Sequence, residues 1–260
     1  MRRRRVGNDA RVNALAKLRS ILEERLALMA PARRLRLALA TREVERRFGT
    51  GAEIRLLDAG CGDGLLSLAM AKGHRSWSVL GVDLRADLLQ GARKRAAARR
   101  LVNVSFVEGN LEQPLPESGT DAVLAVECLS EIPDDRRALQ MMAEALAPGG
   151  ILVVQVPERD WEPVLPGSPG TWREQVRQGY TAAELEAALR AAGLVEVIVR
   201  PTYRSLAAGA QEIRDRIKDR GLLVRLAAFP FLAAAVRLER LGLTFGRPNA
   251  LLAVGSRVTG

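Results

Sequence analysis

The sequence predicts an α/β fold in which helices cover both faces of a mostly parallel, doubly wound sheet. Three observations support this prediction. The chain has 260 residues, 48% of them apolar, which is enough for one domain of this type. Short runs rich in leucine and β-branched residues alternate with stretches of helical composition. A glycine cluster follows the first of these runs. Such alternation implies right-handed crossovers between parallel strands.

The individual elements follow from these runs. Strands are expected at Ile54–Asp58, Ser78–Asp83, Asn103–Glu108, Asp121–Glu127, Gly150–Val156, Leu194–Arg200 and Ala250–Ser256. Helices are expected between them, at Gly64–Lys72, Arg85–Arg100, Pro133–Leu146 and Thr181–Ala192. Pro157–Tyr180, which contains Trp161 and Trp172, is expected to be a loop-rich cover over the strand ends.

Both ends of the chain depart from this alternation. Residues 9–48 are predicted to form one or two helices, with apolar side chains at helical spacing and a break at Pro31. Residues 205–243 are also predicted to be helical, and Gly221–Leu243 is almost wholly apolar, with a bend at Pro230 dividing it into two short helices. We therefore divide the chain into an N-terminal extension (1–49), a core (50–200), a helical insertion (201–249) and a last core strand with its tail (250–260).

Charge is distributed unevenly along the chain. Residues 1–50 carry 14 basic and 5 acidic side chains, residues 51–200 carry 16 and 21, and residues 201–260 carry 10 and 4. Basic ends suit contact with lipid headgroups or nucleic acid, although solvated helix faces give the same pattern. The N-terminus lacks the apolar stretch of a signal peptide, and Cys61 and Cys128 have no disulfide-framework spacing. We therefore expect a cytoplasmic protein that does not span the membrane.

The strongest motif is a buried strand that runs into three alternate glycines and then a helix, with the sequence LLDAGCGDG from Leu56 to Gly64. Glycine is needed where the backbone turns sharply and a ligand approaches it closely. The GxGxG spacing differs from the GxGxxG that seats a pyrophosphate, and Asp58 at the strand end would repel one. S-adenosylmethionine has no phosphate and carries an ammonium and a sulfonium, so it suits this carboxylate. The rival interpretation is a dehydrogenase that binds a nicotinamide cofactor. A measurement of the protein's affinity for that cofactor would test it.

A second carboxylate follows the next strand. Asp83 ends the buried run Val79–Asp83, 25 positions after Asp58, and a carboxylate there can accept hydrogen bonds from both ribose hydroxyls. Leu84 beside it would offer an apolar surface to an adenine ring.

Four segments in order resemble the motifs of class I S-adenosylmethionine-dependent methyltransferases that act mainly on small molecules and lipids. They are LLDAGCGDG, VLGVDL, VEGNLEQPLPESGTDAVLAVECLSEIPD and LAPGGILVVQVP, within residues 50–200. The resemblance implies a Rossmann-like, seven-stranded sheet with an antiparallel last strand and the cofactor across the first four strand ends. It places these residues at the cofactor: Asp58 on the ammonium; Ala59, Gly60, Gly62, Gly64 and Glu127 near the methionine portion or ribose; Asp83 and Leu84 as above; Asn110 and Leu111 at adenine.

Catalytic candidates are few. Methyl transfer from a sulfonium is an in-line displacement that depends largely on orientation. Where the family often has a Glu-His pair, this chain has Ser130 and Glu131. Glu131 is a candidate general base, or a charge at the start of the following helix. Tyr180 and Arg177 are candidate acceptor contacts, or packing residues, and the single histidine, His74, is expected on the surface.

Several functional alternatives stay open. We predict a small-molecule or lipid-like acceptor and no required metal, since ligand-spaced clusters are missing from the sequence. A nucleic-acid acceptor is the runner-up, disfavoured by an aromatic content of 4%. A cofactor-binding accessory protein without turnover is the rival from another class. The apolar insertion is expected to act as a lid, a homodimer contact or a segment on an anionic membrane surface.

Overall fold

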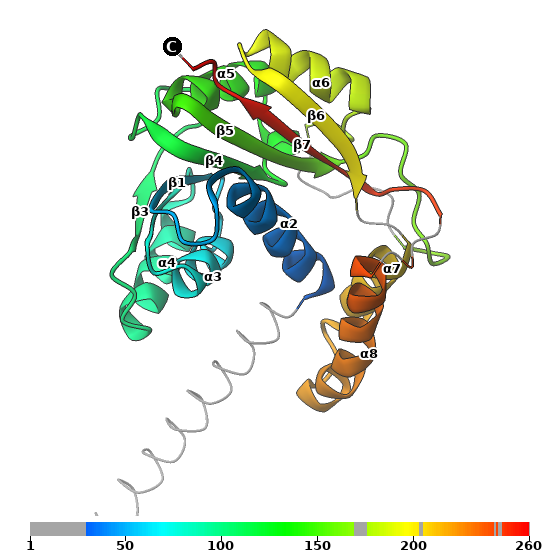
Figure 1. The fold of residues 1–260 in the computed structure, drawn as a ribbon. Helices are drawn as coiled ribbons and strands as arrows, with labels where there is room; N and C mark the ends of the chain where they lie inside the picture. The colour runs from blue at the N-terminus through cyan, green and yellow to red at the C-terminus, as the bar shows by residue number, and fades with distance from the viewer. Residues whose placement is uncertain (1–29, 169–175, 203–204, 242, 244–245, 260) are drawn as a thin grey trace, which may run out of the picture.

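The computed structural model describes residues 30–168, 176–202, 205–241, 243 and 246–259. It contains a seven-stranded sheet with the order β3-β2-β1-β4-β5-β7-β6 (Figure 1). The strands are β1 (Ile54–Ala59), β2 (Trp77–Asp83), β3 (Val104–Glu108), β4 (Thr120–Val126), β5 (Leu146–Pro157), β6 (Val195–Thr202) and β7 (Ala250–Ser256). Only β7 runs antiparallel to its neighbours, so the expected mostly parallel, Rossmann-like sheet is confirmed.

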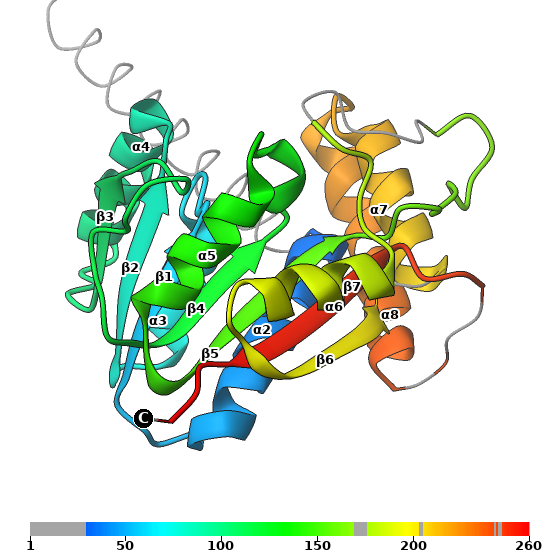
Figure 2. The ribbon, with the colours of Figure 1, turned by 90° about the horizontal axis from the view of Figure 1, so that it is seen from above.

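Helices cover both faces of the sheet. One face carries α2 (Pro31–Phe48), α3 (Leu65–Gly73) and α4 (Ala86–Ala98), and the other carries α5 (Asp135–Ala145) and α6 (Ala182–Ala191) (Figure 2). A short 3₁₀ helix, η1 (Leu129–Glu131), follows β4. The chain order reverses direction between β1 and β4, and the crevice beyond the carboxyl ends of the strands at such a switch point is where ligands bind in these sheets.

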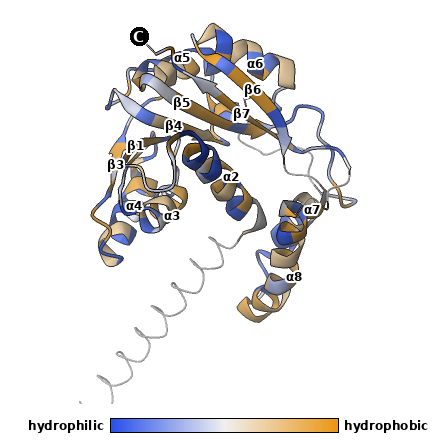
Figure 3. Ribbon diagram, in the orientation of Figure 1, coloured by the Kyte–Doolittle hydropathy of each residue, from blue (hydrophilic) through white to orange (hydrophobic). Residues whose placement is uncertain are grey.

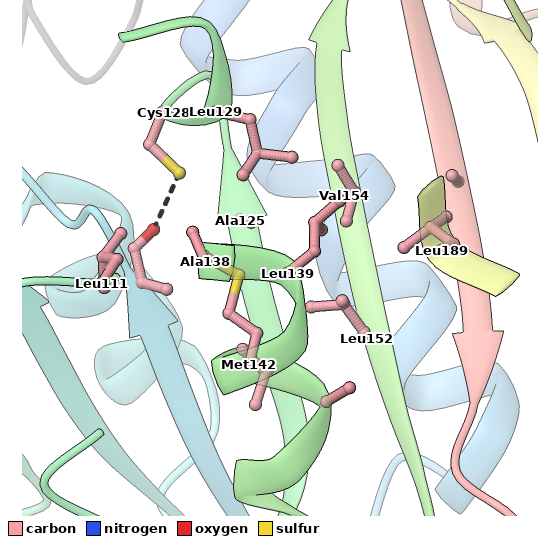
Figure 4. Close-up of a cluster of buried hydrophobic side chains, with 14 of the residues drawn as sticks. Leu111, Ala125, Cys128, Leu129, Ala138, Leu139, Met142, Leu152, Val154 and Leu189 are labelled. Atoms are coloured by element: carbon pink, nitrogen blue, oxygen red, sulfur yellow. Dashed lines mark hydrogen bonds between the residues drawn. The ribbon is translucent and has the colours of Figure 1, made fainter. Parts of the chain in front are cut away.

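The central strands are buried on both sides, which explains their nearly continuous apolar runs. Leu57, Val123 and Val154 of β1, β4 and β5 are completely buried. Figure 4 shows Leu139 and Met142 of α5 packed against this sheet face. The core therefore fixes the strands whose ends form the site.

The two ends of the chain refine the sequence predictions. The described part of the N-terminal extension is α2, which begins at Pro31, where a break was expected; the rest, residues 1–29, lies outside the described residues, as does Trp172. The insertion forms α7 (Ser205–Ile217) and α8 (Leu222–Arg240). The expectation of two short helices within Gly221–Leu243 is wrong, because α8 continues through Pro230. Pro230 is exposed, so its ring is accommodated at the surface.

The helices of the structure can be compared with what a membrane-spanning helix requires. Among the described residues, no helix combines the length and apolar character that crossing a bilayer requires.

Candidate cofactor and acceptor site

The glycine loop after β1 adopts a backbone that only glycine accepts easily. Gly60, Gly62 and Gly64 have φ angles of 73°, 53° and 70°, in the left-handed region. The backbone N–H groups of Gly60 and Cys61 both donate to the carbonyl oxygen of Val82, at 2.8 and 3.0 Å. The loop is therefore tied to the end of β2, where Asp83 follows.

The three glycines have different surroundings. A Cβ on Gly60 would lie 2.4 Å from the Cβ of Cys128, and one on Gly64 would lie 2.6 Å from the Cβ of Ala92. A Cβ on Gly62 would meet nothing within 4 Å. Gly60 and Gly64 are thus required by packing within the protein, whereas Gly62 faces open space of the kind a ligand needs.

Asp83 holds the glycine loop with its carboxylate. One oxygen accepts a hydrogen bond from the backbone N–H of Gly62 at 2.6 Å, and the other accepts one from the N–H of Arg85 at 2.9 Å. Each carboxylate oxygen can accept a further bond, so two remain for a ligand. Leu84 next to it is 65% exposed, which is unusual for leucine and matches the apolar surface expected for adenine.

Asp58 lies beneath the loop and is buried. Its carboxylate accepts a hydrogen bond from the Ser67 hydroxyl at 2.5 Å. Burial raises the pKa of Asp58 to about 6, reinforced by the charges of Asp83 and Asp63 and opposed by the Ser67 bond. A carboxyl group in this state ionises readily when a cation binds near it. Ala59 is buried, and its carbonyl accepts a bond from the Cys128 thiol at 3.2 Å (Figure 4).

This pKa predicts pH-dependent cofactor binding. We expect Asp58, which is ionised above about pH 6, to attract the cofactor ammonium there and to lose that attraction at lower pH. Affinity for S-adenosylhomocysteine, measured by calorimetry across this pH range, should fall about tenfold on acidification. Asp58→Asn should bind weakly at every pH with a flat profile. A wild-type profile as flat as that of the variant would contradict the prediction.

The same shift has a consequence for stability. A raised carboxyl pKa contributes stability that is present below the unfolded value of 3.8 and is lost as the pH rises through about 6. Unliganded Asp58→Asn should therefore melt at a higher temperature than the wild type above about pH 6, as measured by calorimetry. A lower melting temperature there would be the contrary result.

Asn110 and Leu111 begin the turn after β3. The Asn110 side-chain oxygen accepts a hydrogen bond from the N–H of Glu112 at 2.9 Å, which holds the turn. Its second lone pair is still open to an adenine amino group. Leu111 is buried, and its Cδ1 lies 3.7 Å from the position of a Cβ on Gly60. Both residues thus lie beside the glycine loop.

Helix α2 contributes two arginines that the sequence reasoning missed. Arg33 pairs with Asp63 of the glycine loop at 3.0 Å, and Arg36 pairs with Glu127 at 3.1 Å. Their spacing of three residues places both on one helix face, and this spacing was the available signal. Burial raises the pKa of Glu127, and Arg36 opposes that shift. Helix α2 therefore forms one wall of the site.

Buried polar groups gather near the end of β4. Glu127 has a φ of 62°, unusual for a residue with a side chain, and its N–H donates to the carbonyl oxygen of Gln155 on β5 at 2.8 Å. The Gln155 amide is completely buried, and neither of its polar atoms has a partner among the described residues. The same holds for the Ser130 hydroxyl. The sequence analysis did not identify Gln155 as a site residue. A single polar residue inside the apolar run ILVVQVP could have indicated it.

The catalytic candidates have different surroundings. Glu131 is exposed at the end of η1. Tyr180 is buried and donates its hydroxyl to Asp135 at 2.5 Å; burial first, and then this bond, raises its pKa. The Arg177 guanidinium lies 3.8 Å over the Tyr180 ring and also pairs with Asp135. These contacts favour packing for Tyr180 and Arg177, and the catalytic roles of Glu131 and Tyr180 stay predictions.

His74 lies at the opposite edge of the sheet. It follows α3 and stacks on Trp77, the first residue of β2, with ring centroids 3.8 Å apart. It is partly exposed, close to the expected surface position. Because the chain has one histidine, the carboxyl edge of the sheet has none.

Comparisons with known proteins identify methyltransferases among the relatives of this chain. Residues 56–150 match a family model described as a methyltransferase domain. The chain is 34% identical over 152 residues to a trans-aconitate 2-methyltransferase of Rhodopseudomonas palustris strain BisA53, covering 56% of each chain. It is 30% identical over 188 residues to a trans-aconitate 2-methyltransferase of Methylobacterium nodulans, covering 68% of this chain and 71% of the relative. In alignments to three other trans-aconitate 2-methyltransferases, between 41% and 61% of the relative is covered, so the chain spans about half the length of several of the relatives it matches.

Solved structures share the fold. The [4+2]-cyclase SpnF superposes with a TM-score of 0.62 at 25% identity, over 85% of this chain and 81% of that one. Phosphoethanolamine N-methyltransferase 2 of Haemonchus contortus, in complex with S-adenosylmethionine, gives a TM-score of 0.62 at 17% identity, over 85% and 52%.

The fold and the glycine loop with its two carboxylates define a nucleoside-binding α/β protein of the methyltransferase type. The chain belongs to the class I S-adenosylmethionine-dependent methyltransferases. The sequence predictions of this family and its cofactor are thereby confirmed.

Proposed function

We propose that the protein transfers the methyl group of S-adenosylmethionine to a carboxylate oxygen of a small organic acid. The proposal rests on the charged side chains that helix α2 places beside the site. Arg33 and Arg36 bring two cations to the carboxyl edge of the sheet, where histidine is missing. A carboxylate acceptor is already ionised near neutral pH and needs no general base. The trans-aconitate 2-methyltransferases, named for a tricarboxylate, support the same acceptor class.

The residues present fit the cofactor. Gly62 faces open space, Asp83 has free acceptor capacity for ribose hydroxyls, and Leu84 exposes an apolar side chain. Asp58 and Glu127 supply negative charge for the ammonium. When bound, S-adenosylmethionine supplies an electrophilic methyl group on a sulfonium that is a good leaving group. The chain's contribution is then to hold and orient the two reactants, which accounts for a large part of catalysis in such reactions.

Arg36 is the residue we assign to the acceptor. A guanidinium binds a carboxylate with two parallel hydrogen bonds, so it fixes orientation as well as charge. Arg36 is three-quarters buried and held at the end of β4 by Glu127. We assign Glu127 to the cofactor ammonium and the Arg36 guanidinium to the anionic acceptor.

The test is an acceptor screen with S-adenosylhomocysteine release and mass spectrometry of the product. The panel contains tricarboxylates, dicarboxylates, a fatty acid, a phenol and an amine. Methyl esters of acids are expected. Arg36→Gln should raise the KM for the acid about tenfold or more with little change in cofactor affinity, whereas Arg34→Gln, on an exposed position of the same helix, should change neither.

Other outcomes would identify the alternatives. Methylation of the amine or phenol alone would refute a carboxylate acceptor. Cofactor binding without turnover on any acceptor, nucleic acid included, would favour an accessory protein. Turnover of the fatty acid alone would favour a lipid-like acceptor, the second candidate, which the exposed apolar face of α8 supports.

Turnover should not require a metal ion. Methyl transfer to an anion needs no Lewis acid, and the described residues contain no group of three metal-ligating side chains. Activity should therefore be unchanged after treatment with a chelator. Loss of activity that one divalent ion restores would refute this expectation.

A further inference from the structure

Helix α8 leaves a continuous apolar face open to solvent. Its largest exposed side chains are Leu223 (82%), Phe231 (77%) and, just past the helix end, Leu241 (80%). Ala227, Pro230, Ala234 and Leu238 lie at three- and four-residue spacing between them and are also exposed. An exposed apolar stripe of this length along a helix usually marks an interaction site. Figure 3 shows the apolar character of α8.

The opposite face of α8 is already occupied. Val236 of α8 packs in a buried cluster with Ala207 and Ala208 of α7 and with Leu35 of α2. The two helices form a hairpin that extends from the body beside α2 (Figure 1). The exposed stripe is therefore the outer surface of the hairpin, and the fold itself leaves it without a partner among the described residues.

The hairpin of α7 and α8 carries seven basic and four acidic side chains. Three of its four acidic side chains are bound internally. Glu239 accepts from the N–H of Ala207 at 2.8 Å, Glu212 from the N–H groups of Val164 and Leu165 at 2.8 Å, and Asp215 pairs with Arg214 at 2.9 Å.

Unlike most of the acidic side chains, several basic side chains beside the exposed stripe have no ion-pair partner among the described residues. Lys218, Arg220 and Arg237 are exposed, and the described part of the chain provides no ion pair for them. Lys218 and Arg220 lie in the turn before α8, and Arg237 lies at the margin of its apolar face. Asp219 is exposed between Lys218 and Arg220, so the turn keeps a net positive charge, and the open face combines apolar side chains with a local excess of basic ones.

We propose that this face docks on an anionic lipid surface, with the apolar side chains in the interface and the basic groups at the headgroups. An amphipathic helix with such a face binds bilayers through buried apolar area together with attraction to anionic lipids. A second copy would present the same excess of basic side chains, so charge complementarity favours an anionic surface over a symmetric contact. The proposal does not depend on the identity of the methyl acceptor.

Co-sedimentation of the full chain with vesicles tests it. Vesicles of equal parts phosphatidylglycerol and phosphatidylcholine should bring the protein down at low salt, and much less at high salt or with pure phosphatidylcholine. The triple variant L223Q/F231Q/L241Q should reduce the partition coefficient about tenfold or more. The variant K218Q/R220Q/R237Q should do so at low salt by a similar factor.

Control variants remove exposed apolar or basic side chains elsewhere on the protein, to show whether their position on the hairpin matters. Val102 is 94% and Val258 is 56% exposed away from α8, so V102Q/V258Q should bind vesicles as the wild type does. K72Q/R75Q/K94Q removes the same charge from exposed positions on other elements and should retain most of the binding. Calorimetry with S-adenosylhomocysteine shows that each variant is folded.

Two results would overturn the proposal. One is a wild type that ignores anionic vesicles at low salt. The other is a dimer in light scattering that the α8 variants dissociate and that vesicles leave intact, which would assign the face to a second copy.

Discussion

Gly62→Val is expected to lower affinity for S-adenosylmethionine by more than about a hundredfold, because the branched side chain acts on the site in two ways. It occupies the open space that Gly62 faces, where a Cβ meets nothing within 4 Å. It also resists the left-handed backbone, with a φ of 53°, that aligns the Gly62 N–H with Asp83. Calorimetry with the purified variant measures the effect.

Gly193→Val separates strain from steric exclusion. Gly193 follows α6, has a φ of 88°, and a Cβ there also meets nothing within 4 Å, so the variant carries a comparable backbone strain away from the cofactor. It should lose stability and keep its affinity. If Gly62→Val is folded and binds the cofactor as the wild type does, the open space beside Gly62 is not cofactor space.

The sequence predicted the strands that form the site because they are buried on both faces. Such strands are nearly continuous apolar runs that end in acidic or glycine residues. The run that leads into the glycine loop at Leu56–Gly64 and the run Val79–Asp83 are examples. The GxGxG spacing likewise predicted a sharp turn, and all three glycines have positive φ. What the spacing did not show is that Gly60 and Gly64 are needed to fit Cys128 and Ala92. That requirement arises from helices and loops far away in the chain.

The parts that sequence reasoning missed depend on tertiary contacts. Arg36 and Glu127 are 91 positions apart, and only the packing of α2 across the strand ends brings them together. Gln155 reads as an exception within an apolar strand until its burial beside Glu127 is seen. The expected division of Gly221–Leu243 into two short helices was wrong, because Pro230 lies on the exposed side of α8, where the helix continues past its ring.

Asp83→Ala should weaken cofactor binding by about 1–3 kcal/mol, the usual cost of removing one partner of buried polar groups, which is about fivefold to 150-fold in affinity. The carboxylate has two roles in the structure. It accepts bonds from the N–H groups of Gly62 and Arg85, and its remaining lone pairs are those that we assign to the ribose. Removing it therefore loosens the loop as well as the ribose contact.

A ligand lacking one ribose hydroxyl distinguishes these two roles of Asp83. The deoxy analogue of S-adenosylhomocysteine should bind the wild type less tightly than the parent ligand, whereas Asp83→Ala should bind both about equally, since the group that reads the hydroxyl is gone. Asp121→Ala is the matched control, because that carboxylate also accepts a backbone N–H, from Arg55 at 2.8 Å, but at the amino edge of the sheet. It should keep the preference for the parent ligand. A folded Asp83→Ala variant that still discriminates between the two ligands would show that the ribose is held by other residues, and that Asp83 serves only to fix the loop.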